Sequence, residues 1–259
     1  MPEQGAVTRK KLVVFYVLDT SGSMEDDGKI GALNEAMRET VDVLQNIAKG
    51  NADVELQIAV LQFSSGAQWI TEKPIYVEDF YWDDLKAGGL TDIGDALSEL
   101  YNKMSRHEFL QSNTGYMVPI IMSDGYPTDN WEKALQKITD KENGNKWFQY
   151  STKIAFALGR DADAKTLSQI VGNKEAVIQT SDLETFKKMI KVVSASSVLT
   201  NSVSRPQGQD TSNVDIVKNA TGEKQASNSD QQPAQNPPEP DPVPPEPIPE
   251  PGVDVPVGW

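Results

Sequence analysis

The segment LVVFYVLDTSGS, residues 12–23, decides the fold of this chain. Its first seven residues form a continuous apolar run rich in valine, which is typical of a central strand covered on both faces. The run ends at Asp19, and a polar loop that contains glycine follows. Apolar residues then recur at helical spacing from Ile30 to Ala48, and the pattern stops at Lys49 and Gly50, a common helix C-terminus. The segment therefore predicts a strand, a loop and a helix.

The same alternation of strands and helices continues along the chain. Further strands are predicted over residues 54–63, 117–122, 153–158 and 176–179. Further helices are predicted over residues 93–104, 131–138, 162–171 and 183–193. This alternation implies right-handed crossovers and an α/β fold with a doubly wound, mostly parallel sheet that carries helices on both faces.

Two prolines bear on the predicted strands. A short link at residues 64–67 indicates a hairpin into an antiparallel edge strand over 69–77, where Pro74 is tolerable. Pro119 lies inside the predicted strand at 117–122, and because proline lacks a ladder donor, we expect it near the start of that strand or at an irregularity.

The composition of the chain changes at residue 205. Beyond it the sequence is first rich in Gln, Asn, Ser and Asp, and then proline recurs at nearly every second or third position, so we expect no helix or central strand. The predicted organisation is an N-terminal extension over 1–10, one folded domain over 11–204, and a disordered, acidic, proline-rich tail over 205–259.

Charge and residue usage exclude several classes of function. The 259 residues contain no cysteine and one histidine, His107, so thiol catalysis is excluded and a zinc site of imidazoles or a Ser-His-Asp triad is improbable. The formal net charge of −14 disfavours nucleic-acid binding.

No apolar stretch reaches the length of a membrane span, and the run at 12–18 is short for an export signal. We therefore expect a cytoplasmic protein without a membrane partner.

Three polar clusters follow predicted strands or precede predicted helices, at residues 19–23, 88–92 and 123–125. In doubly wound folds ligands bind beyond the carboxyl ends of the strands, which is where these clusters are placed. They offer carboxylate and hydroxyl oxygens but no imidazole or thiolate. Such donors match magnesium, manganese or calcium and not zinc or copper.

At these clusters the chain resembles a von Willebrand factor A (vWA) domain that carries a metal-ion-dependent adhesion site, or MIDAS. Residues 19–23 fit the family's Asp-x-Ser-x-Ser signature, Thr91 stands where its lone threonine is expected, and residues 123–125 fit its Thr/Ser-Asp-Gly element. The three motifs occur in the family's order. The resemblance covers roughly residues 10 to 200, and it implies a vWA fold with a divalent metal site.

The resemblance also implies a role for each site residue. Ser21 and Ser23 would ligate the ion directly, Thr91 directly or through water, and Asp19 and Asp124 directly or through a bridging water. The implied cofactor is Mg²⁺, with Mn²⁺ or Ca²⁺ as alternatives. An Asp or Glu carboxylate of a partner protein would fill the open coordination position, so the implied function is metal-dependent protein binding without enzymatic activity.

Four segments are similar to a narrower group. GKIGALNEAM, AGGLTDIGDAL, SDGYPTDNW and IAFALGRDAD resemble the bacterial intracellular TerY-like proteins, which are associated with tellurite resistance and stress operons. This likeness implies a stress-related or phosphorylation-linked system, with a component of a kinase and phosphatase system as a candidate partner.

Two other classes of function remain as alternatives. An Asp at the end of a first parallel strand, followed by hydroxyl residues and magnesium, also begins aspartate-nucleophile phosphohydrolases, with Asp19 as the nucleophile. That chemistry usually needs a second Asp two positions later, where this chain has Ser21, and a lysine over the phosphate. A nucleotide-binding fold ranks last, because no Gly-rich phosphate loop follows the first strand.

Overall fold

A seven-stranded sheet forms the centre of the computed structural model, which describes residues 9–111, 113–202 and 213–221. The strands are β1 (Lys10–Asp19), β2 (Val54–Ser64), β3 (Gly66–Trp69), β4 (Ile75–Tyr76), β5 (Thr114–Ser123), β6 (Ile154–Leu158) and β7 (Val177–Thr180). Their order is β3-β2-β1-β5-β6-β7, and β4 also pairs with β2. The pairs β1–β2, β1–β5, β5–β6 and β6–β7 are parallel. The predicted mostly parallel sheet with an antiparallel edge is confirmed.

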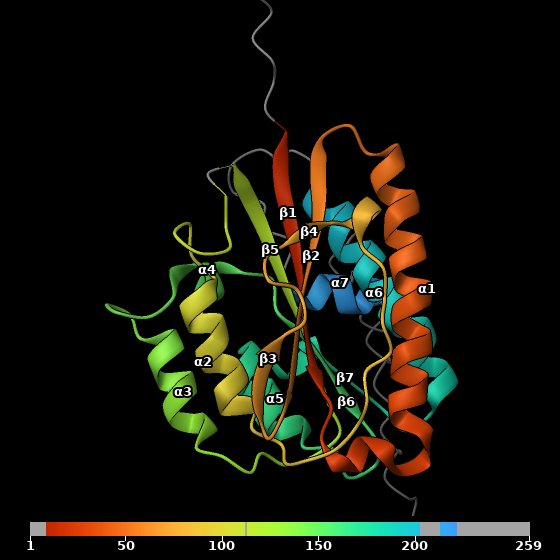
Figure 1. Cartoon of the computed structure of the whole chain (residues 1–259), viewed down its shortest axis with the longest axis vertical. Helices are drawn as coiled ribbons and strands as arrows, with labels where there is room; N and C mark the ends of the chain where they lie inside the picture. Colours follow the sequence, from red (N-terminus) through yellow and green to blue (C-terminus); the bar gives the residue numbers. More distant parts are fainter. Residues whose placement is uncertain (1–8, 112, 203–212, 222–259) are drawn as a thin grey trace, which may run out of the picture. The chain divides into compact units, whose positions relative to one another are not determined.

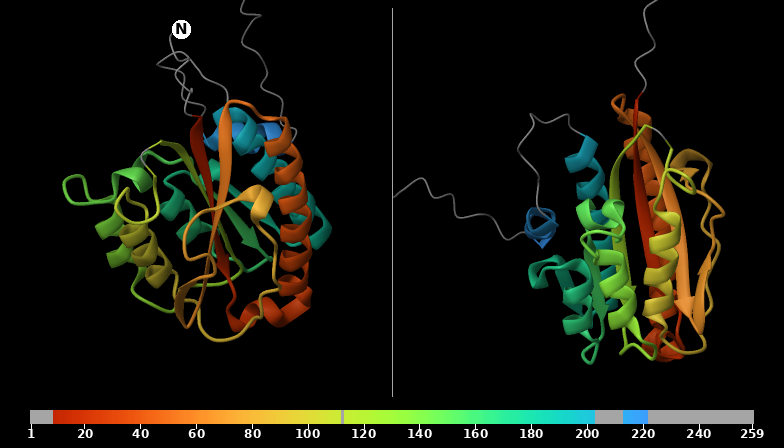
Figure 2. Two further views of the ribbon diagram at one scale, coloured as in Figure 1. Left: turned by 45° about the horizontal axis from the view of Figure 1, so that its top comes forward. Right: turned by 90° about the vertical axis from the view of Figure 1, so that its left-hand side faces the viewer.

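Helices cover both faces of this sheet. They are α1 (Lys29–Gly50), α2 (Ile93–Lys103), α3 (Trp131–Thr139), α4 (Lys146–Tyr150), α5 (Ala164–Val171), α6 (Leu183–Ser202) and α7 (Asn213–Thr221). Short 3-10 segments are η1 (Gly22–Gly28), η2 (Val77–Asp79) and η3 (Lys174–Ala176). In Figure 1 and in the left view of Figure 2, α1 and α2 lie on opposite sides of β1.

The central strand β1 shows why the apolar run is continuous. It pairs with β2 on one edge and β5 on the other, and residues 12–18 are at most 1% exposed. Successive side chains of a strand point to opposite faces. Leu12, Val14 and Tyr16 therefore join the core shared with α1 and α6, while Val13 and Phe15 join the core shared with α2 and α5.

The edge next to β2 differs from the prediction in detail. The single antiparallel strand expected over 69–77 is divided into β3 and β4, which both pair with β2. Between them the amides of Ile70 and Thr71 both donate to the Val60 carbonyl, at 2.8 and 3.5 Å, and Pro74 has no amide to donate. The ladder is interrupted for this reason.

Pro119 lies in the middle of β5, and not near its start or at a register shift with β1, the two placements predicted. It faces Phe15 of β1 in the register, and the pairing of β5 with β6 begins only at Ile120. On the β6 side the Thr152 amide donates to the Met117 carbonyl at 3.3 Å, so the segment before β6 already lies beside β5 here. The missing proline donor is tolerated because the regular β5–β6 ladder begins only after it.

Residues 213–221 form a helix, α7, so the prediction that no helix occurs beyond residue 205 is wrong. Ile216 and Val217 are 0% and 7% exposed and belong to the core beneath α6. Lys218 forms an ion pair with Glu175 at 3.3 Å. The helix is stabilised by these tertiary contacts, which composition alone does not reveal. The N-terminal extension at 1–8 and the proline-rich segment at 222–259 lie outside the described residues.

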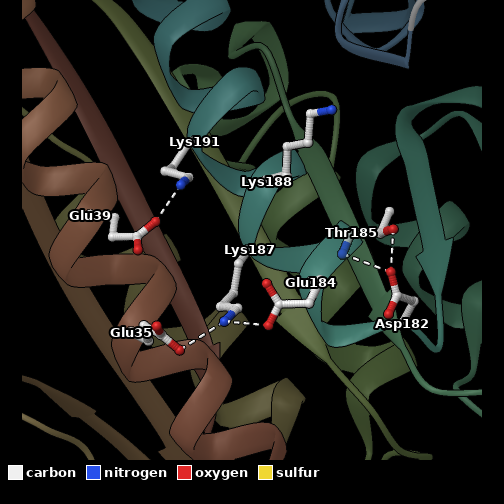
Figure 3. A pocket seen from close by; sticks show the side chains of 8 residues that line it. All are labelled: Glu35, Glu39, Asp182, Glu184, Thr185, Lys187, Lys188 and Lys191. Carbon is white, nitrogen blue, oxygen red and sulfur yellow. Dashed lines mark hydrogen bonds and ion pairs between the residues drawn. The ribbon is translucent and has the colours of Figure 1, made fainter.

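Ion pairs connect α1 to α6 on the outer surface. Lys187 pairs with Glu35 at 2.8 Å, and Lys191 pairs with Glu39 one turn along (Figure 3). The Lys187 ammonium holds the pKa of Glu35 below its usual range. Exposed ion pairs of this kind each contribute little to the free energy of unfolding, so they orient the two helices more than they stabilise their contact.

Within the described residues, no helix has the length and apolar composition needed to cross a membrane.

Candidate metal centre

The three predicted clusters meet at the carboxyl ends of β1 and β5, at the lower end of the sheet in Figure 1, where β1 leads into η1. Backbone hydrogen bonds hold the loops together. The Gly22 amide donates to the Gly89 carbonyl at 3.0 Å, and the Gly88 amide donates to the Thr20 carbonyl at 2.8 Å. Gly89 has a φ of 87°, and a Cβ there would lie 2.7 Å from the Ser65 hydroxyl oxygen. Glycine is required at this position.

Asp19 lies at the bottom of the site, with its side chain 0% exposed. Its Oδ1 accepts the Ser21 backbone amide at 2.7 Å, and its Oδ2 accepts the Ser123 hydroxyl at 2.6 Å. Burial raises the pKa of Asp19, the hydrogen bonds from Ser123 and Ser21 oppose that rise, and the charge of Asp124 adds to it. The site therefore holds a buried carboxyl side chain whose hydrogen-bond donors, a backbone amide and a hydroxyl, are both neutral.

The remaining predicted residues converge above Asp19. The hydroxyl oxygens of Ser21 and Ser23 lie 3.1 Å apart, and the Ser23 hydroxyl donates to Asp124 Oδ1 at 2.7 Å. Thr91 lies near them as well, because a Cβ at Gly125 would lie 3.6 Å from Ser23 Oγ and 3.8 Å from Thr91 Oγ1. The structure thus brings together all five residues that the sequence predicted.

The donor set fits a hard divalent cation. The cluster contains three hydroxyl groups and two carboxylates, and such oxygens are the ligands that Mg²⁺, Mn²⁺ and Ca²⁺ prefer. The described residues contain no group of three or more His, Cys, Asp or Glu placed to hold a metal, so any ion here depends on the hydroxyls.

Hydrogen bonds to Thr128 position Thr91. Its amide donates to the Thr128 hydroxyl oxygen at 2.9 Å, and the Thr128 amide donates to the Thr91 carbonyl at 2.9 Å. The Thr128 hydroxyl in turn donates to Asp92 Oδ1 at 2.8 Å. Nearby, Asp129 accepts the Asp95 amide at the start of α2, and burial raises the pKa of this carboxyl. These acids support the loop and the helix start.

Lys29 is the site residue that the sequence analysis missed. Its ammonium forms an ion pair with Asp124 Oδ2 and donates to the Ser23 carbonyl at 3.0 Å. The Asp124 side chain is 0% exposed and that of Lys29 is 14% exposed. Lys29 is the first residue of α1, and only the path of η1 brings it back to the site. No local motif marks that path.

The comparisons agree with this architecture. The family model described as von Willebrand factor type A domain matches residues 13–192. Similar solved structures include a von Willebrand factor type A protein from Catenulispora acidiphila, with 20% identity and a TM-score of 0.52 over 73% of this chain and 43% of that chain. Proximal thread matrix protein 1 from the mussel byssus, with a zinc-occupied MIDAS motif, has 18% identity and a TM-score of 0.54 over 73% and 48%.

A third similar structure is the pilus adhesin SpaC from Lactobacillus rhamnosus GG in its open conformation, with 13% identity and a TM-score of 0.58 over 74% of this chain and 30% of that chain. The present chain spans less than half the length of these three relatives, and at such identities the likeness concerns the fold alone. A search of curated protein sequences found no match. Because the family model covers more than half of the sequence and the fold agrees with it, the chain belongs to the von Willebrand factor type A domain family.

Proposed function

We propose that this chain is a metal-dependent protein-binding module whose MIDAS-type site holds a divalent cation. The proposed cation is Mg²⁺, with Mn²⁺ or Ca²⁺ as alternatives. One observation carries the proposal: the Ser21 and Ser23 hydroxyls lie 3.1 Å apart, the Ser23 hydroxyl donates to Asp124, and the Ser23 and Thr91 hydroxyl oxygens both lie within 4 Å of the position of a Cβ at Gly125. The zinc-occupied MIDAS motif of the mussel protein with the same fold supports a divalent ion in this kind of site.

The proposed roles follow from the contacts. Ser21, Ser23 and Thr91 would hold the ion through their hydroxyl oxygens, and Asp124 would fix the orientation of the Ser23 hydroxyl that it accepts at 2.7 Å. Asp19 would supply negative charge beneath the ion and orient the loop through Ser21 and Ser123. When bound, the ion would supply a positive anchor for an Asp or Glu carboxylate of a partner protein.

Apolar side chains beside the site favour a protein partner. Leu90 precedes Thr91 and is 55% exposed, and Tyr126 follows Gly125 and is 66% exposed. Large apolar side chains held in solvent next to a charged centre are typical of interaction surfaces, since aromatic and aliphatic anchors carry much of the binding energy there. We propose that the partner offers an acidic residue flanked by apolar side chains.

The geometry gives less support to the phosphohydrolase alternative. A carboxylate nucleophile needs an accessible oxygen, but Asp19 is 0% exposed and each of its oxygens already accepts a hydrogen bond. The only lysine ammonium in contact with the site among the described residues, that of Lys29, is bound to Asp124 and the Ser23 carbonyl. We therefore propose a non-enzymatic role.

The biological setting is proposed from the sequence resemblance to TerY-like proteins. It comprises a cytoplasmic location and a bacterial stress, tellurite-resistance or phosphorylation-linked system, with a component of a kinase and phosphatase system as the candidate partner. Neither nucleic acid nor a membrane is proposed as a partner, and the formal charge of −14 supports the first of these exclusions.

Calorimetry with Mg²⁺ and a peptide selection together test the proposal. Thr91→Val removes one hydroxyl and keeps the backbone contacts of Thr91, so Mg²⁺ affinity should fall at least about tenfold. Thr20→Val is the matched control, because the Thr20 hydroxyl donates to the Phe63 carbonyl at 3.1 Å and is not a proposed ligand.

The peptide selection uses a displayed random library on the immobilised chain with Mg²⁺ and elution by chelator. Eluted peptides should be enriched in Asp or Glu beside apolar residues, and Leu90→Ala with Tyr126→Ala should weaken their binding while Mg²⁺ affinity stays unchanged. Absence of Mg²⁺ binding, or turnover of a generic phosphate ester with Mg²⁺ alone, would reject the proposed function.

A further inference from the structure

We infer that the Lys29 ammonium competes with the proposed metal ion for the same carboxylate, that of Asp124. Lys29 therefore lowers the metal affinity of the site, and it stabilises the fold when no metal is bound. This inference rests on the proposed function, because it presupposes a cation at the site. It assigns Lys29 as the residue that sets the metal concentration at which the site fills.

The contacts of Asp124 carry the first step. Its side chain is 0% exposed, its Oδ1 accepts the Ser23 hydroxyl at 2.7 Å, and its Oδ2 is paired with the Lys29 ammonium. A buried carboxylate requires a charge partner or hydrogen bonds to both oxygens, and here the charge partner is Lys29. The ammonium is also held by the Ser23 carbonyl at 3.0 Å, so it is positioned against the same loop that presents the hydroxyl ligands.

The location of Lys29 on α1 carries the second step. It is the first residue of the helix, where the helix dipole disfavours a positive charge, and the first turn of α1 contains no acidic residue to offset it. The preceding residues Asp27 and Gly28 have φ values of 54° and 75°, and Gly28 provides no side-chain cap. A lysine at this point is unfavourable for the helix itself, and its partner lies in the site.

The charge of the site gives the third step. The site contains two carboxyl side chains, Asp19 and Asp124, and the Lys29 ammonium already forms an ion pair with the second of them. A divalent ion held by Ser23 would lie close to the ammonium that contacts the carboxylate bonded to Ser23. The two cations repel each other at short range in a partly buried site, so the metal binds against Lys29 or displaces it from Asp124.

Calorimetric titration of the full chain with Mg²⁺ tests this inference. Lys29→Met keeps the length of the side chain and removes the charge, so Mg²⁺ should bind at least about tenfold more tightly than to the unmodified chain. In chelator the same variant should melt at least about 5 °C lower, because Asp124 loses its charge partner, and saturating Mg²⁺ should restore most of that loss. Lys29→Arg retains the charge and should behave like the unmodified chain in both measurements.

Lys187→Met serves as the control for net charge, since it also removes one positive charge but from a lysine paired with Glu35. Its Mg²⁺ affinity should remain unchanged. Unchanged or weaker Mg²⁺ binding by Lys29→Met, with normal binding by the unmodified chain, overturns the role of Lys29 and leaves the proposed function standing. Tighter Mg²⁺ binding by Lys29→Met than by the unmodified chain and by Lys187→Met supports the inference. No binding by any of the proteins overturns both.

Discussion

Replacing Asp19 by asparagine or by alanine separates its charge from its hydrogen bonds. Asparagine keeps a carbonyl oxygen for the Ser21 amide and presents an amide to the Ser123 hydroxyl, which can accept as well as donate. Alanine leaves both groups without their present partner. Either change removes one of the two carboxylates, so Mg²⁺ binding should weaken by at least about tenfold in both variants.

The effects on stability should differ between the two variants. Each of the two buried groups that lose their partner costs about 1–3 kcal/mol, so Asp19→Ala should lower the free energy of unfolding by about 2–6 kcal/mol in chelator. Asp19→Asn should be at least as stable as the unmodified chain at neutral pH, because it removes a carboxylate whose charged form is disfavoured by burial.

The pH dependence follows from the raised pKa of Asp19. A carboxyl with a raised folded pKa contributes stability that is fully present below its unfolded pKa and is lost as the pH rises through the folded pKa. The advantage of Asp19→Asn should therefore be largest at neutral pH and shrink as the pH falls toward about 4.

Urea unfolding in chelator, at neutral pH and near pH 4, measures these differences, and calorimetry with Mg²⁺ measures the loss of binding. The unmodified chain is the reference in each series. Equal stability of Asp19→Ala and Asp19→Asn would show that the two hydrogen bonds contribute nothing. If Asp19→Asn binds Mg²⁺ with the affinity of the unmodified chain, Asp19 is not part of the metal site.

Three further predictions concern the whole domain. Mg²⁺ at about 100 times its dissociation constant should raise the free energy of unfolding by about 2.7 kcal/mol, and a melting temperature indifferent to Mg²⁺ and to chelator would contradict this. Burial lowers the pKa of Lys153 to about 8, so between that pH and the ordinary lysine pKa the unfolded chain binds more protons than the folded one. In urea unfolding, the free energy of unfolding of the unmodified chain should therefore rise by about 2 kcal/mol relative to that of Lys153→Met between about pH 7.5 and about pH 9.5. A difference in stability that stays the same over this range would contradict the lowered pKa. A chain that ends at residue 204 should melt at a lower temperature than one that ends at residue 224. Its free energy of unfolding should be lower by about 2–5 kcal/mol, because it loses the buried side chains of Ile216 and Val217. Equal melting temperatures would mean that α7 does not stabilise the domain.

The parts of the fold that the sequence predicted are those with a strong local pattern. The run at residues 12–18 is apolar throughout because both faces and both edges of β1 are covered, and that environment leaves a clear record in the sequence. Asp19 and Asp124 could be placed together for the same reason. Asp19 is the last residue of β1 and Asp124 directly follows β5, and neighbouring parallel strands end at the same edge of the sheet.

The features that the sequence did not predict depend on contacts between distant segments. Lys29 reaches Asp124 only because η1 turns through left-handed backbone at Asp27 and Gly28, and neither the direction nor the extent of such a turn is encoded by periodicity. In α7 two adjacent apolar residues, Ile216 and Val217, are buried against α6 within a polar stretch. Their burial becomes evident only when the partner helix is known.

The burial of carboxylates gives a physical reason to locate function at this end of the sheet. Among the described residues, Asp19 and Asp124 are the only acidic residues that are buried, and they lie in the same site. Burying a carboxylate destabilises a fold unless a cation or several hydrogen bonds compensate it. Asp124 is compensated by Lys29, whereas the hydrogen bonds to Asp19 come from a neutral amide and a neutral hydroxyl. A neutral residue at position 19 would avoid this cost, so the buried carboxylate there supports the proposal that a cation binds at this site.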